Sequence, residues 1–429
     1  MESKGIQVPK NTMILGRDAY YSLDTYATGR NNNVVVIGSP GSGKTRSIIS
    51  PNLLQATGSY VVTDPKGNLY DKYRLYLHRK GYITRRIDFT GSKKSAKYNP
   101  ILKAETEDEI AELAHTIIFS NHGMIAKDPY WDEAAETLLN ALLSYLLIDC
   151  KREKCTFSSV MELIGMAGND ENDVGIASDL DLLFNDLGLR EPNCSAVRNY
   201  KSFRQNAGKT RLCILNVLST TVSRYAAQTI EDILQGDDIN IPEIGQRKTA
   251  IFITVSDTDR HLDGLINIVF TQIMQGLVKY ADSCPNSHLP IPVRFLMDDF
   301  ATNVTISQFP SLIACIRSRW ISAVIILQTE SQLLERYEED GRTILGCCDT
   351  YVYLGGGDID TAEHVARRAD RALKSIMEMP LGSGLIFRRG EKARECKTFP
   401  LEEFEKQQFY DAHVSYNKKT ENNYDTTKG

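Results

Sequence analysis

The chain has 429 residues and a formal net charge of -5, with 42% hydrophobic and 24% charged residues. These values are ordinary for a soluble globular protein of two or three domains. They exclude a chain that is basic throughout, so any contact with nucleic acid must come from a local patch. No signal peptide and no apolar stretch of membrane-spanning length is visible in the sequence.

The nine cysteines are scattered along the chain and form no C-x-x-C pair or cluster with zinc-ligand spacing. Cys347 and Cys348 are adjacent, and we interpret them as small core residues rather than as a redox pair. This pattern indicates a reduced compartment and a cytoplasmic protein.

The polar segment 1–32 leads into an apolar strand and then into a phosphate-binding loop. The loop matches the pattern G-x-x-x-x-G-K-[ST] and comprises Gly38, Ser39, Pro40, Gly41, Ser42, Gly43, Lys44 and Thr45. Its glycines let successive N–H groups surround a phosphate, while Lys44 reaches the β- and γ-phosphates and Thr45 binds Mg²⁺. A plain glycine-rich turn is disfavoured, because a strand and a helix flank the motif as its chemistry requires.

Alternating strands and helices follow the loop. We expect a helix over 46–55 that is kinked or broken near Ser47–Ser50 by Pro51, and strands over 59–63 and 82–89 with a helix between them. This order predicts a parallel sheet. At the end of the strand 59–63, Asp64 and Lys66 either face the nucleotide or a neighbouring subunit, or form a turn whose aspartate caps the next helix.

The texture changes after residue 104 to almost purely helical periodicity. We predict an all-α domain over 105–238, inserted between two parts of a nucleotide-binding domain at 1–104 and 239–415. A polar tail at 416–429 is expected to lack regular structure. The segment from Ser195 to Arg211 is basic, and its charges contact cargo or only form a solvated helix face. These charges are Arg198, Lys201, Arg204, Lys209 and Arg211.

The α/β pattern resumes with a strand over 249–255 and continues with a strand over 292–299 that ends in two acids. Asp298 is the candidate Mg²⁺ ligand, and Asp299 is the candidate group that orients and polarises the attacking water. Further strands are expected over 321–327, 350–354 and 384–388. The predicted fold class is therefore α/β, with a mostly parallel sheet flanked by helices.

Several further motifs resemble the type IV coupling proteins, the VirD4/TraG-like ATPases of bacterial conjugation, over almost the whole chain. They are the phosphate-binding loop, Val61–Gly67, Asp128–Trp131, Tyr200–Phe203, Leu296–Ala301, Leu312–Arg319, Ile325–Gln328 and Cys348–Gly356. The resemblance implies a RecA-like, FtsK-related motor domain with an inserted all-α domain. It also implies a homo-hexameric ring that binds ATP and Mg²⁺ between subunits, with monomers expected in isolation.

The resemblance assigns two further site residues. Arg317 matches an arginine finger that acts on the neighbouring subunit's γ-phosphate, a role that suits the planar and permanently charged guanidinium. Gln328 matches a glutamine that senses the γ-phosphate. Without the resemblance, an ion pair at the surface would be the favoured interpretation of Arg317 or Arg319.

The chain departs from the family pattern in two ways. The family usually has Asp-Glu where this chain has Asp298-Asp299, and the shorter carboxylate predicts weak basal hydrolysis. Many relatives also carry N-terminal transmembrane helices, which this sequence lacks. We expect a partner to recruit the protein to the inner face of the cell membrane, with removal of an anchor as the alternative.

The resemblance implies an ATP-driven coupling protein that delivers or pumps DNA to a type IV secretion channel. Its expected partners are single-stranded DNA bound with little sequence preference, a relaxase, and the channel ATPases or a membrane anchor protein. The alternative is a recruitment module that binds nucleotide and docks cargo with little hydrolysis.

Overall fold

A computed structural model describes residues 6–65, 67–91, 94–119, 129–168, 177–256, 262–300, 306 and 308–425. Two compact units divide the chain. The first contains residues 1–86, 240–255 and 274–429, and the second contains 87–239 and 256–273. The second unit thus begins before the predicted boundary at 105 and takes in a later segment as well.

The first unit is built on a nine-stranded sheet with the strand order β11-β10-β9-β3-β8-β7-β4-β6-β5. The strands are β3 (Val34–Ile37), β4 (Ser59–Thr63), β5 (Ile83–Asp88), β6 (Thr249–Thr254), β7 (Val293–Met297), β8 (Ile321–Leu327), β9 (Thr350–Tyr353), β10 (Ser383–Arg388) and β11 (Arg394–Lys397). The six neighbours from β9 to β6 are parallel, while β10 and β11 are added as antiparallel edge strands beside β9. The carboxyl ends of the six parallel strands therefore lie together along one border of the sheet, which is called its carboxyl edge below.

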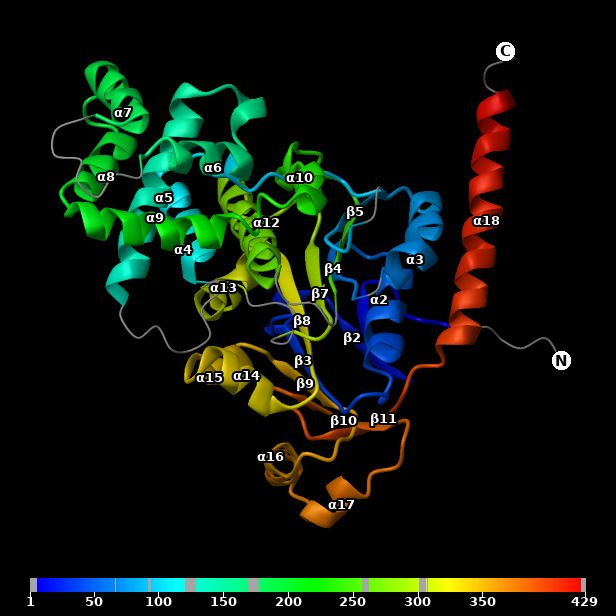
Figure 1. Ribbon diagram of the computed structural model, residues 1–429. Helices are drawn as coiled ribbons and strands as arrows, with labels where there is room; N and C mark the ends of the chain where they lie inside the picture. Colours follow the sequence, from blue (N-terminus) through cyan, green and yellow to red (C-terminus); the bar gives the residue numbers. More distant parts are fainter. Residues whose placement is uncertain are drawn as a thin grey trace. The chain divides into compact units, whose positions relative to one another are not determined.

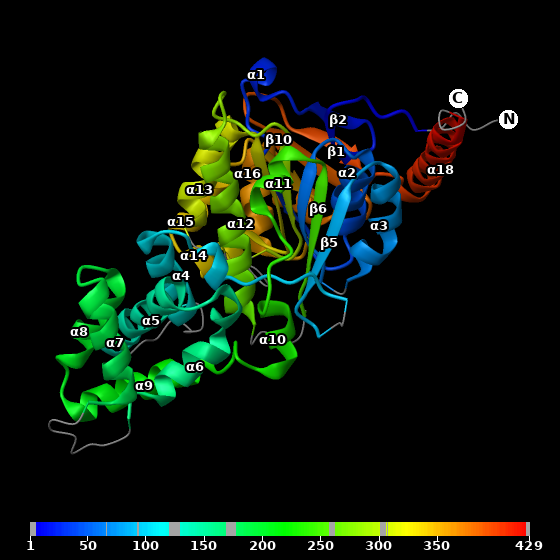
Figure 2. The same cartoon turned by 90° about the horizontal axis from the view of Figure 1, so that it is seen from above.

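Helices cover both faces of this sheet, with α2 and α3 on one face and α13 and α15 on the other (Figures 1 and 2). The helical segments of the first unit are α1 (Thr25–Thr28), η1 (Thr45–Ile49), α2 (Ser50–Gln55), α3 (Asn68–Arg79), α11 (Ile241–Gln246), α13 (Phe309–Cys315), η4 (Ile316–Arg319), α14 (Glu330–Tyr337), α15 (Asp340–Gly346), α16 (Ile359–Ala369), α17 (Leu373–Met377) and α18 (Leu401–Asp425). Helix α12 (Asp263–Ser283) contains the division between the units.

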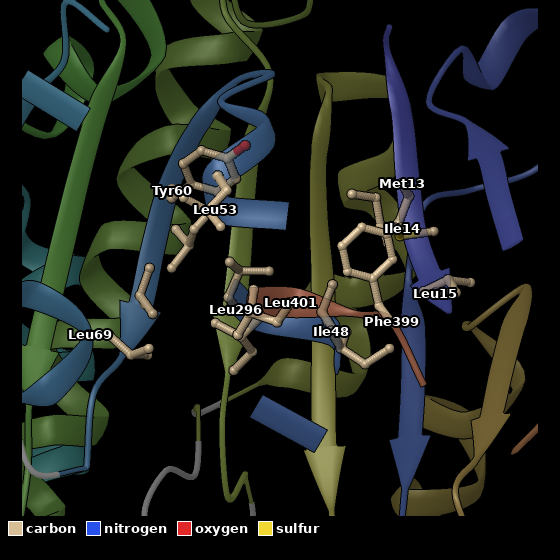
Figure 3. Packing of buried hydrophobic residues seen from close by; sticks show 14 of the residues in the cluster. Met13, Ile14, Leu15, Ile48, Leu53, Tyr60, Leu69, Leu296, Phe399 and Leu401 are labelled. Carbon is tan, nitrogen blue, oxygen red and sulfur yellow. The ribbon is translucent and has the colours of Figure 1, made fainter. Parts of the chain in front are cut away.

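The main core lies between the sheet and helices α2, α3 and α18 (Figure 3). Val34 and Val36 of β3 point into this core, so Val35, which is also fully buried, faces the opposite side of the sheet. Burial on both faces explains why the central strands are continuously apolar rather than alternating. Leu401 and Phe404 bring α18 into the same core.

The segment after the phosphate-binding loop has the irregularity that Pro51 predicts. Residues Thr45–Ile49 form a π-helix, closed by the N–H of Ser50 on the carbonyl of Thr45, before α2 begins. Proline has no N–H to donate to the preceding turn, so the regular hydrogen-bond ladder cannot pass through this point.

Two terminal segments differ from the sequence-based expectation. Residues 12–22 form an antiparallel hairpin of β1 (Thr12–Gly16) and β2 (Ala19–Ser22). Helix α18 continues to Asp425, so residues 416–425 have helical backbone where an unstructured tail was predicted. No proline or glycine interrupts the sequence between 401 and 425, and nothing in it stops the helix.

The second unit is helical apart from the start of its chain. Its helical segments are η2 (Ile101–Lys103), α4 (Glu107–Phe119), α5 (Pro129–Asp149), η3 (Arg152–Lys154), α6 (Phe157–Gly165), α7 (Asp179–Arg190), α8 (Ser195–Arg204), α9 (Gly208–Val222) and α10 (Gln228–Leu234). Helix α5 packs against α4, α8 and α9, and Leu138, Leu139 and Leu142 are completely buried. Aromatic rings of Phe184 and Tyr200 stack at 4.0 Å between α7 and α8.

Within the described residues, no helix combines the length and the apolarity that crossing a membrane requires.

Candidate nucleotide site

The phosphate-binding loop leaves β3 at the carboxyl edge of the sheet. Gly41 and Gly43 have φ values of 81° and 82°, which favour glycine because they lie in the left-handed region. The N–H groups of Gly41, Gly43, Lys44 and Thr45 donate to no acceptor among the described residues. Such a run of unpaired N–H groups in a glycine-rich turn is a cradle for an anion.

The side chains of the loop also fit a phosphate. Lys44 is buried, and its Nζ donates to the carbonyls of Gly38 at 2.5 Å and Ser39 at 3.2 Å. Burial lowers the pKa of Lys44, and the carboxylates of Asp299 and Asp298 act in the opposite direction. The hydroxyl of Ser42 is buried and has no hydrogen-bond partner among the described residues. Phosphate oxygens can replace the carbonyls as acceptors for the Lys44 ammonium group. They can also supply the partner that the Ser42 hydroxyl lacks.

Strand β7 brings its two acids to the same edge. The Thr45 hydroxyl donates a short hydrogen bond to Oδ2 of Asp298. Burial raises the pKa of Asp298, as does the charge of Asp299, while the Thr45 hydrogen bond and the Lys44 charge lower it. A threonine hydroxyl beside one buried carboxylate fits Mg²⁺, which keeps several waters and takes few protein ligands. Asp299 is half-buried, and its backbone φ is 49°. Its N–H donates a hydrogen bond to Oδ1 of Asp298 at 3.2 Å.

Gln328 directly follows β8, the strand between β3 and β7. The N–H of Gly38 donates to the carbonyl of Leu327 at 3.2 Å, so Gln328 lies next to the first residue of the loop. The structure therefore brings Lys44, Thr45, Asp298 and Gln328 to one edge of the sheet, together with Asp299.

Arg317 lies elsewhere. It belongs to η4, which precedes β8, so the seven residues of this strand separate it from Gln328 by about 20 Å. Its Nη2 donates to the carbonyl of Thr25 at 3.0 Å. Arg319, by contrast, forms an ion pair with Asp282 at 2.7 Å, which accounts for that residue structurally. Within one subunit, Arg317 does not reach the phosphate-binding loop.

Asp64 caps a helix. Its carboxylate accepts hydrogen bonds from the N–H groups of Leu69 at 3.0 Å and Tyr70 at 2.8 Å, at the start of α3. Burial raises the pKa of Asp64, and these two hydrogen bonds oppose the shift. Of the two roles left open by the sequence, the structure favours the cap. Lys66, Asp128 and Ala301 lie outside the described residues.

Sequence reasoning missed two residues that shape the site. The N–H of Asp298 donates to the Thr63 hydroxyl at 2.5 Å, and that hydroxyl donates to the Asp298 carbonyl at 3.1 Å, which fixes the acid from the neighbouring strand β4. Gly355, after β9, accepts from the N–H of Ser39 at 3.0 Å and so braces the loop. The sequence signals that could have identified these two residues were the polar Thr63 at the end of β4 and the run of glycines at 355–357.

The basic segment of the second unit is largely committed to contacts within that unit. Arg198 pairs with Glu107 at 2.9 Å, Arg204 pairs with Asp181 at 2.8 Å, and Arg211 donates to the carbonyl of Asn206. Lys201 and Lys209 are exposed, as is the ion-paired Arg198, while Arg204 and Arg211 are half-buried. The structure thus favours the structural interpretation for the three arginines.

Residues 1–369 match the model of the family described as "Type IV secretory system Conjugative DNA transfer". The chain belongs to this family. The protein VirD4 of Rhizobium radiobacter is 21% identical over 343 residues, which cover 79% of this chain and 48% of that protein. The chain thus spans about half the length of this relative.

Solved structures of plasmid coupling protein TrwB have the same fold. One, in complex with the non-hydrolysable ATP analogue ADPNP, gives a TM-score of 0.65 at 14% identity and covers 92% of this chain and 90% of that one. Another, in complex with ADP and Mg²⁺, gives a TM-score of 0.60 at 15% identity and covers 85% and 84%. The prediction of an α/β P-loop fold with a mostly parallel sheet is confirmed by this likeness and by the observed sheet.

Proposed function

We propose that this protein is an ATPase that couples DNA cargo to a type IV secretion channel during conjugative transfer. The observation that carries the proposal is the hydrogen bond between Thr45 and Asp298, which joins the phosphate-binding loop to the acidic strand β7. The family membership supports the role in DNA transfer. The TrwB complexes with ADPNP and with ADP and Mg²⁺ support ATP and Mg²⁺ as the ligands.

Each residue at this edge has a distinct proposed task. Lys44 would exchange the carbonyls of Gly38 and Ser39 for the β- and γ-phosphates of ATP. Thr45 and Asp298 would hold Mg²⁺, which neutralises phosphate charge when it is bound. Asp299 would orient and polarise the attacking water, and the Gln328 amide would contact this water and the γ-phosphate.

Arg317 is proposed to complete the site of a neighbouring subunit in a homo-hexameric ring. Its distance from its own loop, about 20 Å along β8, is consistent with action in trans. A guanidinium placed on the γ-phosphate would stabilise the charge that develops as the phosphoryl group leaves.

The cargo is proposed to be single-stranded DNA with its relaxase. The charge of -5 leaves local patches as the means of DNA contact. Exposed Lys201 and Lys209 are available for such contacts in the second unit, whereas the neighbouring arginines are engaged. Recruitment to the inner face of the membrane by a partner, and contact with channel ATPases, belong to the same proposal.

DNA-stimulated ATP hydrolysis tests the motor against the alternative of a recruitment module. We expect single-stranded DNA to increase the rate of phosphate release, and Lys44→Ala to abolish both basal and stimulated rates. Arg342→Ala, which changes an exposed residue that pairs with nearby Glu339, is the matched control. Tight binding of DNA with no stimulation would instead favour the recruitment module, for which the short Asp299 carboxylate is the structural argument.

A further inference from the structure

A cavity of about 460 Å³ lies in the first unit, at the amino ends of three parallel strands. Ser59, Val293 and Ile321, the first residues of β4, β7 and β8, all line it. The phosphate-binding loop is at the carboxyl ends of the same sheet. The cavity is therefore separate from the nucleotide site of its own subunit.

Arg294, the second residue of β7, carries a buried charge into the lining of this cavity. Its exposed fraction is 6%, and Nη1 donates to Oδ1 of Asn52 at 3.2 Å, an oxygen that also accepts from the N–H of Ile14. Nε is buried without a partner, and no carboxylate among the described residues pairs with this arginine. Burial lowers the pKa of Arg294, which reflects the cost of a charge without a counter-ion.

The other walls add a second guanidinium and an aromatic surface. Arg317 lines the cavity, with its Nη2 on the carbonyl of Thr25 at 3.0 Å. Trp320 and Tyr26 contribute rings. The carboxylate of Asp24 is also present, but it already accepts from the N–H groups of Tyr26 and Ala27 at 3.0 and 2.9 Å as the cap of α1. The guanidinium groups of Arg294 and Arg317 thus line a cavity in which the Asp24 carboxylate is already hydrogen-bonded to the start of α1.

We propose that this cavity is a second ligand site, which binds a small organic anion with a carboxylate or phosphate group on a flat ring. The anionic group accepts hydrogen bonds from the guanidinium of Arg294, which supplies the missing counter-charge. The ring lies against the indole of Trp320. A volume of about 460 Å³ is within the range of small-molecule sites. The cavity shares Arg317 with the contact proposed to act in trans, but Arg294, on which this proposal rests, has no part in the proposed nucleotide chemistry.

Tryptophan fluorescence tests the site directly, because the chain has two tryptophans and one of them lines the cavity. In the full chain with Trp131→Phe, Trp320 is the remaining reporter. We expect phenyl phosphate or benzoate to change its emission saturably at millimolar concentration, and neutral benzyl alcohol to have little effect. The anion that binds more tightly shows whether the site prefers a phosphate or a carboxylate group.

Substitution of Arg294 then separates a built site from adventitious binding. We expect Arg294→Met, which keeps the length of the side chain, to weaken binding by about ten-fold or more, and Arg294→Lys to weaken it less. Arg342→Met, at an exposed position outside the cavity, is the control and should bind as the parent does. Lys44→Ala should also keep the response, because it disables only the phosphate-binding loop.

Three results would overturn the proposal. They are the absence of a saturable response to either anion, an equal response to benzyl alcohol, and undiminished binding by Arg294→Lys together with Arg294→Met. Should Arg294→Met not fold, Arg294→Lys decides alone, because it retains the charge and loses the planar fork.

Discussion

Asp298 is held in surroundings that oppose its charge. It is buried beside the Asp299 carboxylate, while the Thr45 hydroxyl, the Lys44 charge and the N–H of Asp299 favour its charged form. A carboxylate that is strained in this way without a cation becomes a strong ligand once Mg²⁺ is present. As the proposed Mg²⁺ ligand, Asp298 would lower the stability of the empty protein and raise its affinity for the cation.

Replacement of Asp298 by asparagine should stabilise the protein without nucleotide. The raised pKa of Asp298 means that its charged form disfavours the folded state, so the stability it provides is present at low pH and is lost as pH rises through the folded pKa. We expect Asp298→Asn to raise the free energy of unfolding by about 1 kcal/mol at pH 7, with a gain that shrinks as pH falls through the folded pKa of Asp298. Thermal unfolding over a series of pH values measures both, and a gain that does not shrink towards acid pH would contradict the cause given.

Asp299 should be needed for hydrolysis but not for binding. The side chain is half-buried and next to the proposed Mg²⁺ ligand. We expect Asp299→Asn to lower the rate of ATP hydrolysis by about 100-fold, because the amide cannot accept a proton, with nucleotide affinity unchanged. Phosphate release and equilibrium binding of an ATP analogue are the two measurements. An unchanged rate of hydrolysis would remove Asp299 from its proposed role.

At the scale of elements, the ends of strands and helices position the site. Thr63 at the end of β4 fixes the backbone of Asp298 at the end of β7, and Gly355 after β9 fixes Ser39. The π-helix Thr45–Ile49 follows the loop and continues directly into α2, whose Leu53 and Leu54 are buried in the core. The loop is thus anchored on both sides by packed elements, while its own N–H groups stay available.

Asp64 should contribute to stability through α3 rather than to nucleotide binding. Loss of its two hydrogen bonds to the first turn of α3 predicts that Asp64→Ala lowers the free energy of unfolding by about 1–2 kcal/mol. Asp71→Ala, on the same helix with 69% of its side chain exposed, should change it by less than about 0.5 kcal/mol. Thermal unfolding gives the stability, and a large loss of ATP-analogue affinity in Asp64→Ala would revive the nucleotide-facing role.

For the whole molecule, the proposals place chemistry at both ends of the parallel strands of one sheet. The carboxyl ends of β3, β7 and β8 gather the groups proposed to bind and hydrolyse ATP. The amino ends of β4, β7 and β8 gather Arg317, Arg294 and the cavity. A site that needs groups from both edges can be completed only by another copy of the chain, which is the physical argument for a ring.

Mixing two inactive variants should restore part of the activity. Arg317→Ala keeps a complete phosphate-binding loop, and Lys44→Ala keeps a complete finger. We expect each alone to lose hydrolysis, by about 1,000-fold for Arg317→Ala, and an equimolar mixture to recover activity where an intact loop meets an intact finger. The mixture is assayed with single-stranded DNA, and the mass of the assembly is measured with and without ATP and DNA. A monomer under every condition, or no recovery in a mixture that assembles, would contradict action in trans.

The sequence by itself determined the phosphate-binding loop, the acidic strand end and the α/β class. These features depend on local spacing and on runs of apolar residues, which are written in consecutive positions. Gln328 was assigned through the resemblance of Ile325–Gln328 to a family motif, and its role stays a prediction. Helical periodicity over 105–238 predicted an inserted all-α domain for the same reason.

Only the tertiary structure decided which side chains meet. The strand order puts β8 between β3 and β7, and β8 holds Arg317 and Gln328 at its opposite ends although only ten residues separate them in the sequence. Asp64 as a cap, Thr63 and Gly355 as supports, and Arg294 without a counter-ion all depend on neighbours distant in the chain. Such contacts follow from packing and register, which no local pattern encodes.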